Sequence, residues 1–193
     1  MPAFSALPLK TERLVLRPLG PQDASALFAI YSDPKAMRYW GTPAWSKIDQ
    51  AVAMIERETI ALEAGEHLRL GIERQVDGEF IGACTLFSFH ESSRRAEIGY
   101  ILAPDCWGQG YMSESLSALV GYGFKHLNLN RIEADIDPRN ERSAKVLLRL
   151  GFIHEGLLRQ RWIVSGEVSD TGLFGLLRAD WERTLVTLQP SGA

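Results

Sequence analysis

Short runs of alternating apolar and polar residues mark the strands of this chain. R-L-V-L-R at 13–17 alternates over a partly β-branched segment, a pattern typical of a half-buried strand. Two further runs, 67–74 and 79–87, flank V-D-G, which predicts an antiparallel hairpin. The remaining strands are predicted at 95–102, 131–136, near 152–163 and at 168–177.

Helical spacing appears between these strands. Pro21 and Asp23 open a first helix, and Asp33-Pro34 ends it. A second helix is predicted over about 47–64, with Gly65 as its stop. Its apolar face follows a four-three-four-three spacing through Ile48, Val52, Ile55, Thr59 and Leu62.

Two more helices are expected in the second half. The stripe that predicts the third is Met112, Leu116, Leu119, Val120, Gly123 and Leu127. The fourth runs from Asn140 to Leu150 and stops at Gly151, and its apolar side is Ala144, Leu147 and Leu148.

The order of elements predicts one parallel crossover, across residues 95–136, inside a mostly antiparallel sheet. The 193 residues suit a single domain, 1–193, with a core of about 10–181. The segments before about Thr11 and after about Gln189 are expected to be tails.

Composition narrows the class of protein. Hydrophobic residues make up 46%, charged residues 23%, and the net charge of −3 does not favour a nucleic-acid partner. Cys84 and Cys106 form no C-x-x-C motif and the four histidines are scattered, so we expect neither a disulfide scaffold nor a metal site. A signal peptide and a membrane-spanning apolar run are both absent from the pattern, so we expect a cytoplasmic protein, monomeric or homodimeric, with no membrane partner.

One stretch, D-C-W-G-Q-G-Y-M-S-E at 105–114, joins a predicted strand to a predicted helix. The first N–H groups of a helix lack internal partners, and the helix dipole adds positive charge there. Glycines let the backbone take positive φ and approach a ligand closely. The stretch therefore predicts an anion site, most naturally for phosphate.

Several ligands fit such a turn. A P-loop would need G-K-S or G-K-T, which this chain lacks. A dinucleotide fingerprint would need a third glycine where Ser113 stands, although Asp135 lies at a suitable distance for a ribose contact. The pyrophosphate of coenzyme A and a tight turn without any ligand remain open.

The surrounding residues resemble a known superfamily. A-E-I-G-Y-I-L, W-G-Q-G-Y-M-S-E and N-E-R-S-A-K-V-L-L-R-L-G-F at 140–152 are similar to the GCN5-related N-acetyltransferases (GNAT). The opening T-E-R-L-V-L-R-P-L and the closing D-T-G-L-F-G-L-L-R-A-D-W resemble the branch that acetylates ribosomal-protein N-termini (the Rim type). The resemblance implies an α/β (α+β) GNAT fold: a mixed, mostly antiparallel sheet with splayed parallel strands, flanked by helices.

The resemblance also implies acetyl-CoA as co-substrate, with no metal. The family's acyl-CoA loop falls on residues 107–112. Trp107 replaces the Gln or Arg of the family pattern, and Met112 replaces its final small residue. Backbone N–H groups of residues 108–113 would bind pyrophosphate, and Glu114 must point away from it. The implied cofactor-binding residues are Ile101, Leu102, Gly108, Gln109, Gly110, Tyr111, Met112, Ser113 and Asn140.

Acetyl transfer to an amine needs a base, a site for the developing oxyanion and a route for the departing thiolate. Glu97 matches the general base of several family members, and desolvation on a central strand would raise its pKa. The family's usual tyrosine acid falls on Leu147, so the resemblance points to Ser143, one turn earlier, as the acid. A structural Glu97 and a Ser143 that merely decorates the turn beside the Asn140 cap are the alternatives.

The resemblance implies direct acetylation of a primary amine, with a protein N-terminus as acceptor. A small-molecule amine (polyamine, antibiotic or metabolite) and a non-catalytic acyl-CoA-binding protein are the alternatives. The loops 33–50 and 157–170 would set the acceptor, and Tyr39, Trp40 and Trp45 either line its site or belong to the core. Cys106 raises the further alternative of a covalent acyl-enzyme.

Overall fold

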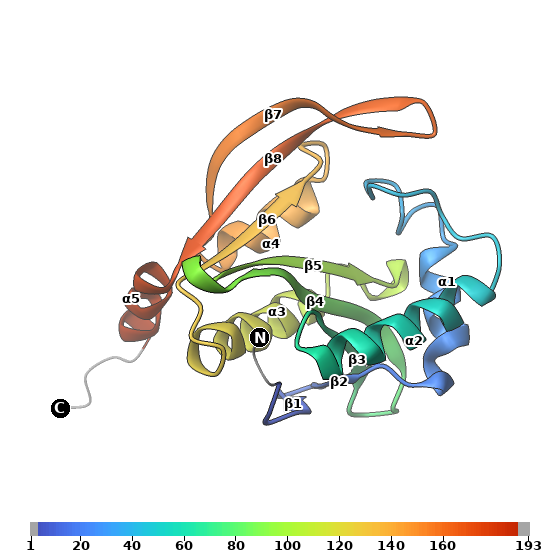
Figure 1. Ribbon diagram of the computed structural model, residues 1–193, viewed down its shortest axis with the longest axis horizontal. Coiled ribbons are helices and arrows are strands. Elements are labelled where there is room, and N and C mark those ends of the chain that lie inside the picture. Colours follow the sequence, from blue (N-terminus) through green and yellow to red (C-terminus); the bar gives the residue numbers. More distant parts are fainter. Residues whose placement is uncertain (1–3, 189–193) are drawn as a thin grey trace.

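The computed structural model describes residues 4–188 (Figure 1). Within that range eight strands form one sheet, in the order β1-β2-β3-β4-β5-β6-β8-β7. The strands are β1 (Leu9–Lys10), β2 (Leu14–Pro18), β3 (Leu68–Arg74), β4 (Phe80–His90), β5 (Arg95–Leu102), β6 (Arg131–Ile136), β7 (Ile153–Val164) and β8 (Glu167–Leu177). The helices are α1 (Ala24–Tyr31), α2 (Asp49–Ala64), α3 (Tyr111–Lys125), α4 (Glu141–Arg149) and α5 (Arg178–Leu188).

Helices pack on both faces of the sheet and build two hydrophobic cores. On one face, called the α3–α4 face below, Leu116 of α3 and Leu147 of α4 are fully buried. On the other, the α1–α2 face, Leu27 of α1 and Ile55 of α2 fill the core. Figure 1 shows the long β7–β8 hairpin reaching from the far edge of the sheet toward the connection between α1 and α2.

Strands β5 and β6 form the parallel pairing of the described sheet, and this pairing is short. It runs from Arg95↔Arg131 to Glu97↔Glu133. Beyond Glu97, β5 stays paired with β4 as far as Leu102, while β6 stays paired with β8 as far as Ile136. The facing edges of β5 and β6 therefore separate and leave main-chain groups that need another partner. This geometry confirms the predicted mixed, mostly antiparallel sheet with splayed parallel strands.

Local signals placed most boundaries correctly. The strand predicted at 131–136 is β6, residue for residue. Gly65 ends α2 with φ +73°, and Gly151 follows α4 with φ +90°, as expected of left-handed helix stops. The V-D-G turn joins β3 to β4 and has Gly78 at φ +72°.

The predicted apolar face of the second helix is only partly correct: Ile55 is buried and Leu62 packs against the core of the α3–α4 face, but two other positions are exposed. Ile48 and Val52 are 44% and 43% exposed. The buried side of α2 is Ala51, Met54, Ile55, Glu58 and Ala61. Glu58 is buried on this side, with Oε1 3.2 Å from Nε of Arg69 on β3. A glutamate in a helix is normally read as surface, so the sequence pattern did not mark Glu58 as part of the buried side.

Other differences concern α4 and the chain ends. Leu148 is 54% exposed, whereas Leu147 is buried. Strand β1 lies within the predicted N-terminal tail. Helix α5 was not predicted, because Thr and Val give its segment weak helical propensity. Packing supports α5 instead: the ring of Trp181 lies 5.2 Å from that of Phe124 on α3.

Candidate active site

The predicted phosphate loop connects β5 to α3. Gly108 and Gly110 have φ of +78° and +83°, which glycine adopts without strain. A Cβ placed on Gly108 would meet nothing within 4 Å, so the backbone there borders open space. The N–H groups of residues 108–113 donate no hydrogen bond to any described residue. The loop therefore presents a row of unpaired donors at the positive end of α3.

Two arginines border this loop, and the sequence reading missed both. Arg13 of β2 donates from Nη1 to the carbonyl of Gln109 at 3.0 Å. The guanidinium of Arg142, in the first turn of α4, lies 5.1 Å from the centre of the Trp107 ring. Trp107 itself is held because its Nε1 donates to the carbonyl of Leu102 at 2.9 Å. Both cations reach the loop from distant parts of the chain, so no local motif marks them.

The side chains of Met112 and Glu114, at the start of α3, point away from the unpaired N–H groups of the loop. Glu114 accepts from the Arg13 main-chain N–H at 2.8 Å and from Oγ1 of Thr11 at 2.6 Å. Although burial disfavours its charge, these partners and the Arg13 guanidinium hold the pKa of Glu114 below its ordinary value. Met112 is buried in the core of the α3–α4 face. Neither side chain occupies the space in front of the unpaired N–H groups.

Asn140, Ser143 and Tyr100 form a cluster on the α3–α4 face. Oδ1 of Asn140 accepts from the Ser143 N–H at 3.1 Å, the helix cap expected from its residue type. The hydroxyl of Tyr100 on β5 lies 2.5 Å from Oγ of Ser143. Burial raises the pKa of Tyr100 to about 12, although Ser143 lowers it slightly, so the phenol keeps its proton at neutral pH. Tyr100 is a functional candidate that the sequence analysis did not single out.

Glu97 lies on the opposite, α1–α2 face, at the last residue pair before β5 and β6 separate. Burial raises its pKa, and the negative charges of Asp135 and Glu133 on β6 raise it further. A hydrogen bond from Ser88 on β4 and the charge of Arg95 act in the other direction. This environment makes Glu97 a stronger base than an ordinary surface carboxylate.

The predicted residues Ile101 and Leu102 complete β5 beside the opening. Ile101 packs in the core of the α1–α2 face, and Leu102 in the core of the α3–α4 face. Because the strand passes between the two cores, the widening gap after Glu97 connects the face that carries Ser143 with the face that carries Glu97.

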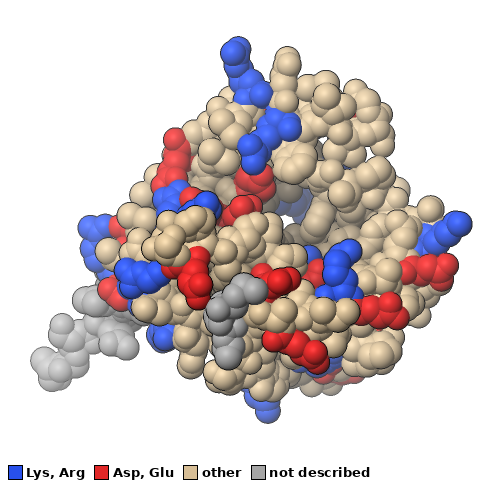
Figure 2. All heavy atoms as spheres, in the orientation of Figure 1, with Lys and Arg blue, Asp and Glu red and all other residues tan. Residues whose placement is uncertain are grey.

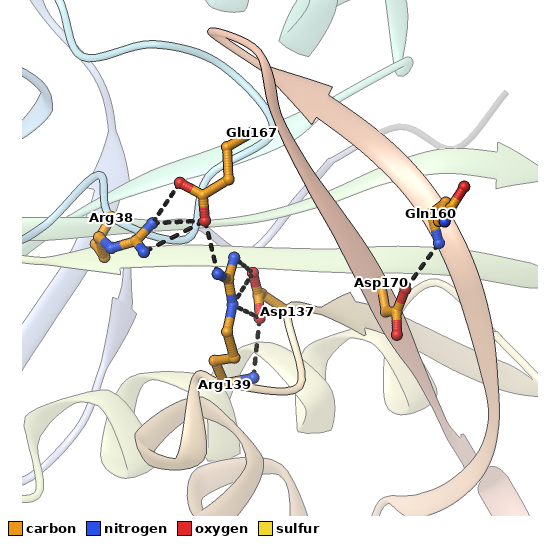
Figure 3. Close-up of polar contacts among 6 residues, drawn as sticks. All are labelled: Arg38, Asp137, Arg139, Gln160, Glu167 and Asp170. Atoms are coloured by element: carbon orange, nitrogen blue, oxygen red, sulfur yellow. Dashed lines mark hydrogen bonds and ion pairs between the residues drawn. The ribbon is translucent and has the colours of Figure 1, made fainter.

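Ion pairs surround the gap on the α1–α2 side. Arg139, in the turn before α4, donates from Nη1 to Glu167 Oε1 at 2.6 Å. Arg38, after α1, donates to Glu167 at 3.2 Å, and Asp137 accepts from Arg139 Nη2 at 2.6 Å (Figure 3). These four residues, the Glu167 clasp, join the hairpin to the α1–α2 connection, and Figure 2 shows the surface hollowed beneath the hairpin.

Other sequence candidates have structural roles. Trp45 stacks on the buried Tyr31 at 4.4 Å, and Trp40 meets the edge of the same ring at 5.4 Å, so both belong to the core of the α1–α2 face. Tyr39 lies beside the clasp, with its ring 5.4 Å from the guanidinium carbon of Arg38. Burial raises the pKa of the Cys106 thiol, which makes it a poor nucleophile.

Residues 4–188 contain neither a cluster of metal ligands nor a membrane-crossing helix. No group of three or more His, Cys, Asp or Glu side chains there is placed to hold a metal ion. No helix in that range combines the length and the apolar character needed to cross a bilayer. The dinucleotide alternative is also disfavoured, because a parallel first βαβ unit does not precede the loop.

Curated relatives of this chain are N-acetyltransferases. The uncharacterised N-acetyltransferase YoaA of Bacillus subtilis is 39% identical over 170 residues, 88% of this chain and 96% of its own length. "Putative ribosomal N-acetyltransferase YdaF" of the same organism is 31% identical and covers 89% of this chain and 94% of its own length. Spermidine N(1)-acetyltransferase of Escherichia coli K12 is 26% identical and covers 79% of each chain.

Solved structures and a family match agree with these relatives. The structure of Mycobacterium smegmatis RimJ in complex with CoA-disulfide has a TM-score of 0.81 and 26% identity, covering 94% of this chain and 93% of that one. Residues 13–153 match the acetyltransferase (GNAT) domain family. The splayed sheet and the glycine loop agree with these matches, which show that the chain belongs to the GNAT acetyltransferase family and is an N-acetyltransferase.

Proposed function

We propose that this enzyme transfers an acetyl group from acetyl-CoA to the N-terminal amine of a protein, as the ribosomal-protein acetyltransferases do. The observation that carries the proposal is the opening between β5 and β6, which has unpaired amides on one side and Glu97 on the other. The substrates would meet there from opposite faces of the sheet.

The N–H groups of residues 108–113 would bind the pyrophosphate of acetyl-CoA, helped by the dipole of α3. Arg142 and Arg13 would add positive charge at the rim of the loop. Asn140 would keep its role as helix cap while its remaining donors face the pantetheine arm. The RimJ structure supports this assignment, because that protein is seen in complex with CoA-disulfide.

Glu97 would act as the general base, directly or through a water molecule. It takes one proton from the acceptor's ammonium group and later releases it to solvent. The neutral amine then forms the N–C bond to the thioester carbonyl, and the C–S bond breaks as the tetrahedral adduct collapses. In this collapse the nitrogen gives its second proton to a water molecule, and the sulfur gains one proton as it leaves, so one net proton is released for each amide formed.

The Tyr100–Ser143 pair would supply the sulfur's proton. Both hydroxyls lie on the face from which the coenzyme would enter, and the phenol keeps its proton at neutral pH. A thiol with a pKa near 8.5 leaves without strong assistance, so a weak acid is sufficient. The pair therefore replaces the tyrosine that the family usually places at the position of Leu147.

The charge distribution around the gap supports a singly charged acceptor. Arg95 and Arg131 both donate to Glu133, at 2.8 and 2.7 Å. Glu155 pairs with Arg131 at 2.9 Å, and the clasp neutralises Glu167. Few carboxylates therefore remain for the several ammonium groups of a polyamine, whereas a peptide N-terminus brings only one charge.

A thiol-release assay tests the proposal. The enzyme is mixed with acetyl-CoA and, separately, with short peptides that begin with Ala or Ser, the same peptides with a blocked N-terminus, and spermidine. We expect free-amine peptides to give the highest kcat/KM, and blocked peptides none. Higher kcat/KM with spermidine would overturn the proposed acceptor and favour the small-molecule alternative.

A further inference from the structure

Asp135 lies on the same side of the gap as Glu97. In the parallel pairing Glu97 is opposite Glu133, and Asp135 follows two residues later on β6, so it shares that face. Glu133 is held by two arginines, but Asp135 accepts no hydrogen bond from any described side chain. Its nearest cation is Arg161 of β7, whose Nε lies 3.7 Å from Oδ2. Two carboxylates with incomplete pairing thus face the gap.

A bulge in β7 directs Arg161 toward Asp135. The register between β7 and β8 slips between Leu158 and Trp162, so the intervening residues lack strand partners. Gln160 has φ +52° and donates its N–H to Oδ1 of Asp170 at 2.8 Å (Figure 3). A non-glycine residue in this conformation is uncommon and tends to occur where function requires it. Bulges commonly re-aim a side chain beside an active site.

The bulge also anchors the hairpin over the gap. The Trp162 ring would lie 3.4 Å from a Cβ placed on Gly41, so β7 contacts the connection between α1 and α2. The Glu167 clasp ties the same hairpin to Arg38 and Arg139. Arg161 is therefore held near Asp135 by the packing of Trp162 beside the bulge and by the ion pairs of Glu167 in the same hairpin, and not by a hydrogen bond to Asp135 itself.

The Arg161–Asp135 contact leaves the carboxylate poorly compensated. Burial raises the pKa of Asp135, and Arg161 only partly reverses the shift. The separation of 3.7 Å exceeds that of a charge-assisted hydrogen bond. An ammonium group has three donors on one compact charge, so it could bind Asp135 more closely than the guanidinium does.

We propose that Asp135 is a positioning residue that binds the acceptor's ammonium group beside Glu97, and that Arg161 occupies Asp135 until the acceptor arrives. On binding, the ammonium takes the place of the guanidinium at Asp135, and Arg161 donates instead to the carbonyl oxygen next to the amine. The pair thereby selects an amine that is followed by a carbonyl group, the chemistry of a peptide N-terminus. This inference rests on the proposed function, since it concerns the same acceptor.

Three variants test it: Asp135→Asn, Arg161→Gln and, as matched control, Arg159→Gln from the same bulge. We measure kcat and KM with an Ala-initiated peptide and with n-butylamine, an amine without a carbonyl. Asp135→Asn should raise both amine KM values at least about tenfold, because it removes one charge-assisted hydrogen bond. It should leave the KM for acetyl-CoA unchanged. Arg161→Gln should raise the peptide KM and lower the butylamine KM, while Arg159→Gln changes neither.

A pH profile separates positioning from mere structural support. The groups that face Glu97 are Asp135 and Glu133 from β6, Ser88 from β4 and Arg95 from its own strand. Removing the charge of Asp135 should therefore move the acidic limb of kcat/KM to lower pH, a shift that Arg159→Gln would not produce. Unchanged amine KM values in Asp135→Asn, or equal effects of both arginine variants, would overturn the inference.

The two hypotheses fail separately. Wild-type enzyme that acetylates butylamine but no peptide refutes the proposed acceptor, and Asp135→Asn is then scored on butylamine alone. Wild-type enzyme that acetylates the peptide, with an unchanged peptide KM in Asp135→Asn, refutes only the role of Asp135. Thermal unfolding of each variant confirms that it is folded.

Discussion

The glycine loop gives the sharpest test of coenzyme binding, through Gly108→Ala. Gly108 has φ +78°, and a Cβ there would project into open space, so the substitution meets no steric clash within the protein. Left-handed φ costs an L-residue about 1–2 kcal/mol, and the lower entropy of the unfolded chain returns roughly 0.4–1 kcal/mol. We expect a net loss of about 1 kcal/mol in the free energy of unfolding, or roughly 2–4 °C in Tm for a chain of this size.

Gly78→Ala is the matched control for this prediction. Gly78 has φ +72° and equally open surroundings, but it lies in the β3–β4 turn. Both variants should lose the same stability, yet only Gly108→Ala places a methyl group where phosphate would approach the backbone. The loss of one hydrogen bond to a charged group is about 1.5–3 kcal/mol, so the Kd for acetyl-CoA should rise roughly ten- to a hundredfold. Calorimetric titration measures it, and equal Kd values in the two variants would refute the phosphate role of the loop.

The remaining predictions concern the two faces of the gap. Glu97→Gln should lower kcat at least about tenfold, because it removes the proposed base. It should not lower Tm at pH 7. Burial raises the folded-state pKa of Glu97, so ionisation of this carboxylate destabilises the folded state as pH rises through that pKa. If the two hydroxyls act as one unit, Tyr100→Phe and Ser143→Ala should each lower kcat about tenfold, and the double variant should lower kcat little further. Steady-state assays in which the two losses of kcat add in free energy would contradict this. Cys106→Ala should keep kcat/KM within about twofold, and a burst of thiol release without acceptor would be evidence for the rejected acyl-enzyme.

Local pattern predicted much of the fold and part of the site. The strand pattern gave β6, and glycine chemistry gave a loop whose φ values and unpaired amides match the expectation. Contacts between distant segments were not predictable. The meeting of Tyr100 with Ser143 depends on how α4 packs on β5, and the burial of Glu58 depends on Arg69 from another strand. The direction of Arg161 depends on a register slip that its own sequence does not mark.

The separation of Glu97 and Ser143 onto opposite faces has a chemical consequence. An enzyme that stored the acetyl group on itself would need a nucleophile near both substrates, and the thiol closest to the loop, Cys106, is buried and held in its protonated form. The gap in the sheet removes that need. In the proposed mechanism it would let Glu97 and the Tyr100–Ser143 pair work on the two sides of one carbonyl without competing for space. Direct transfer is therefore the chemistry that this arrangement of strands favours.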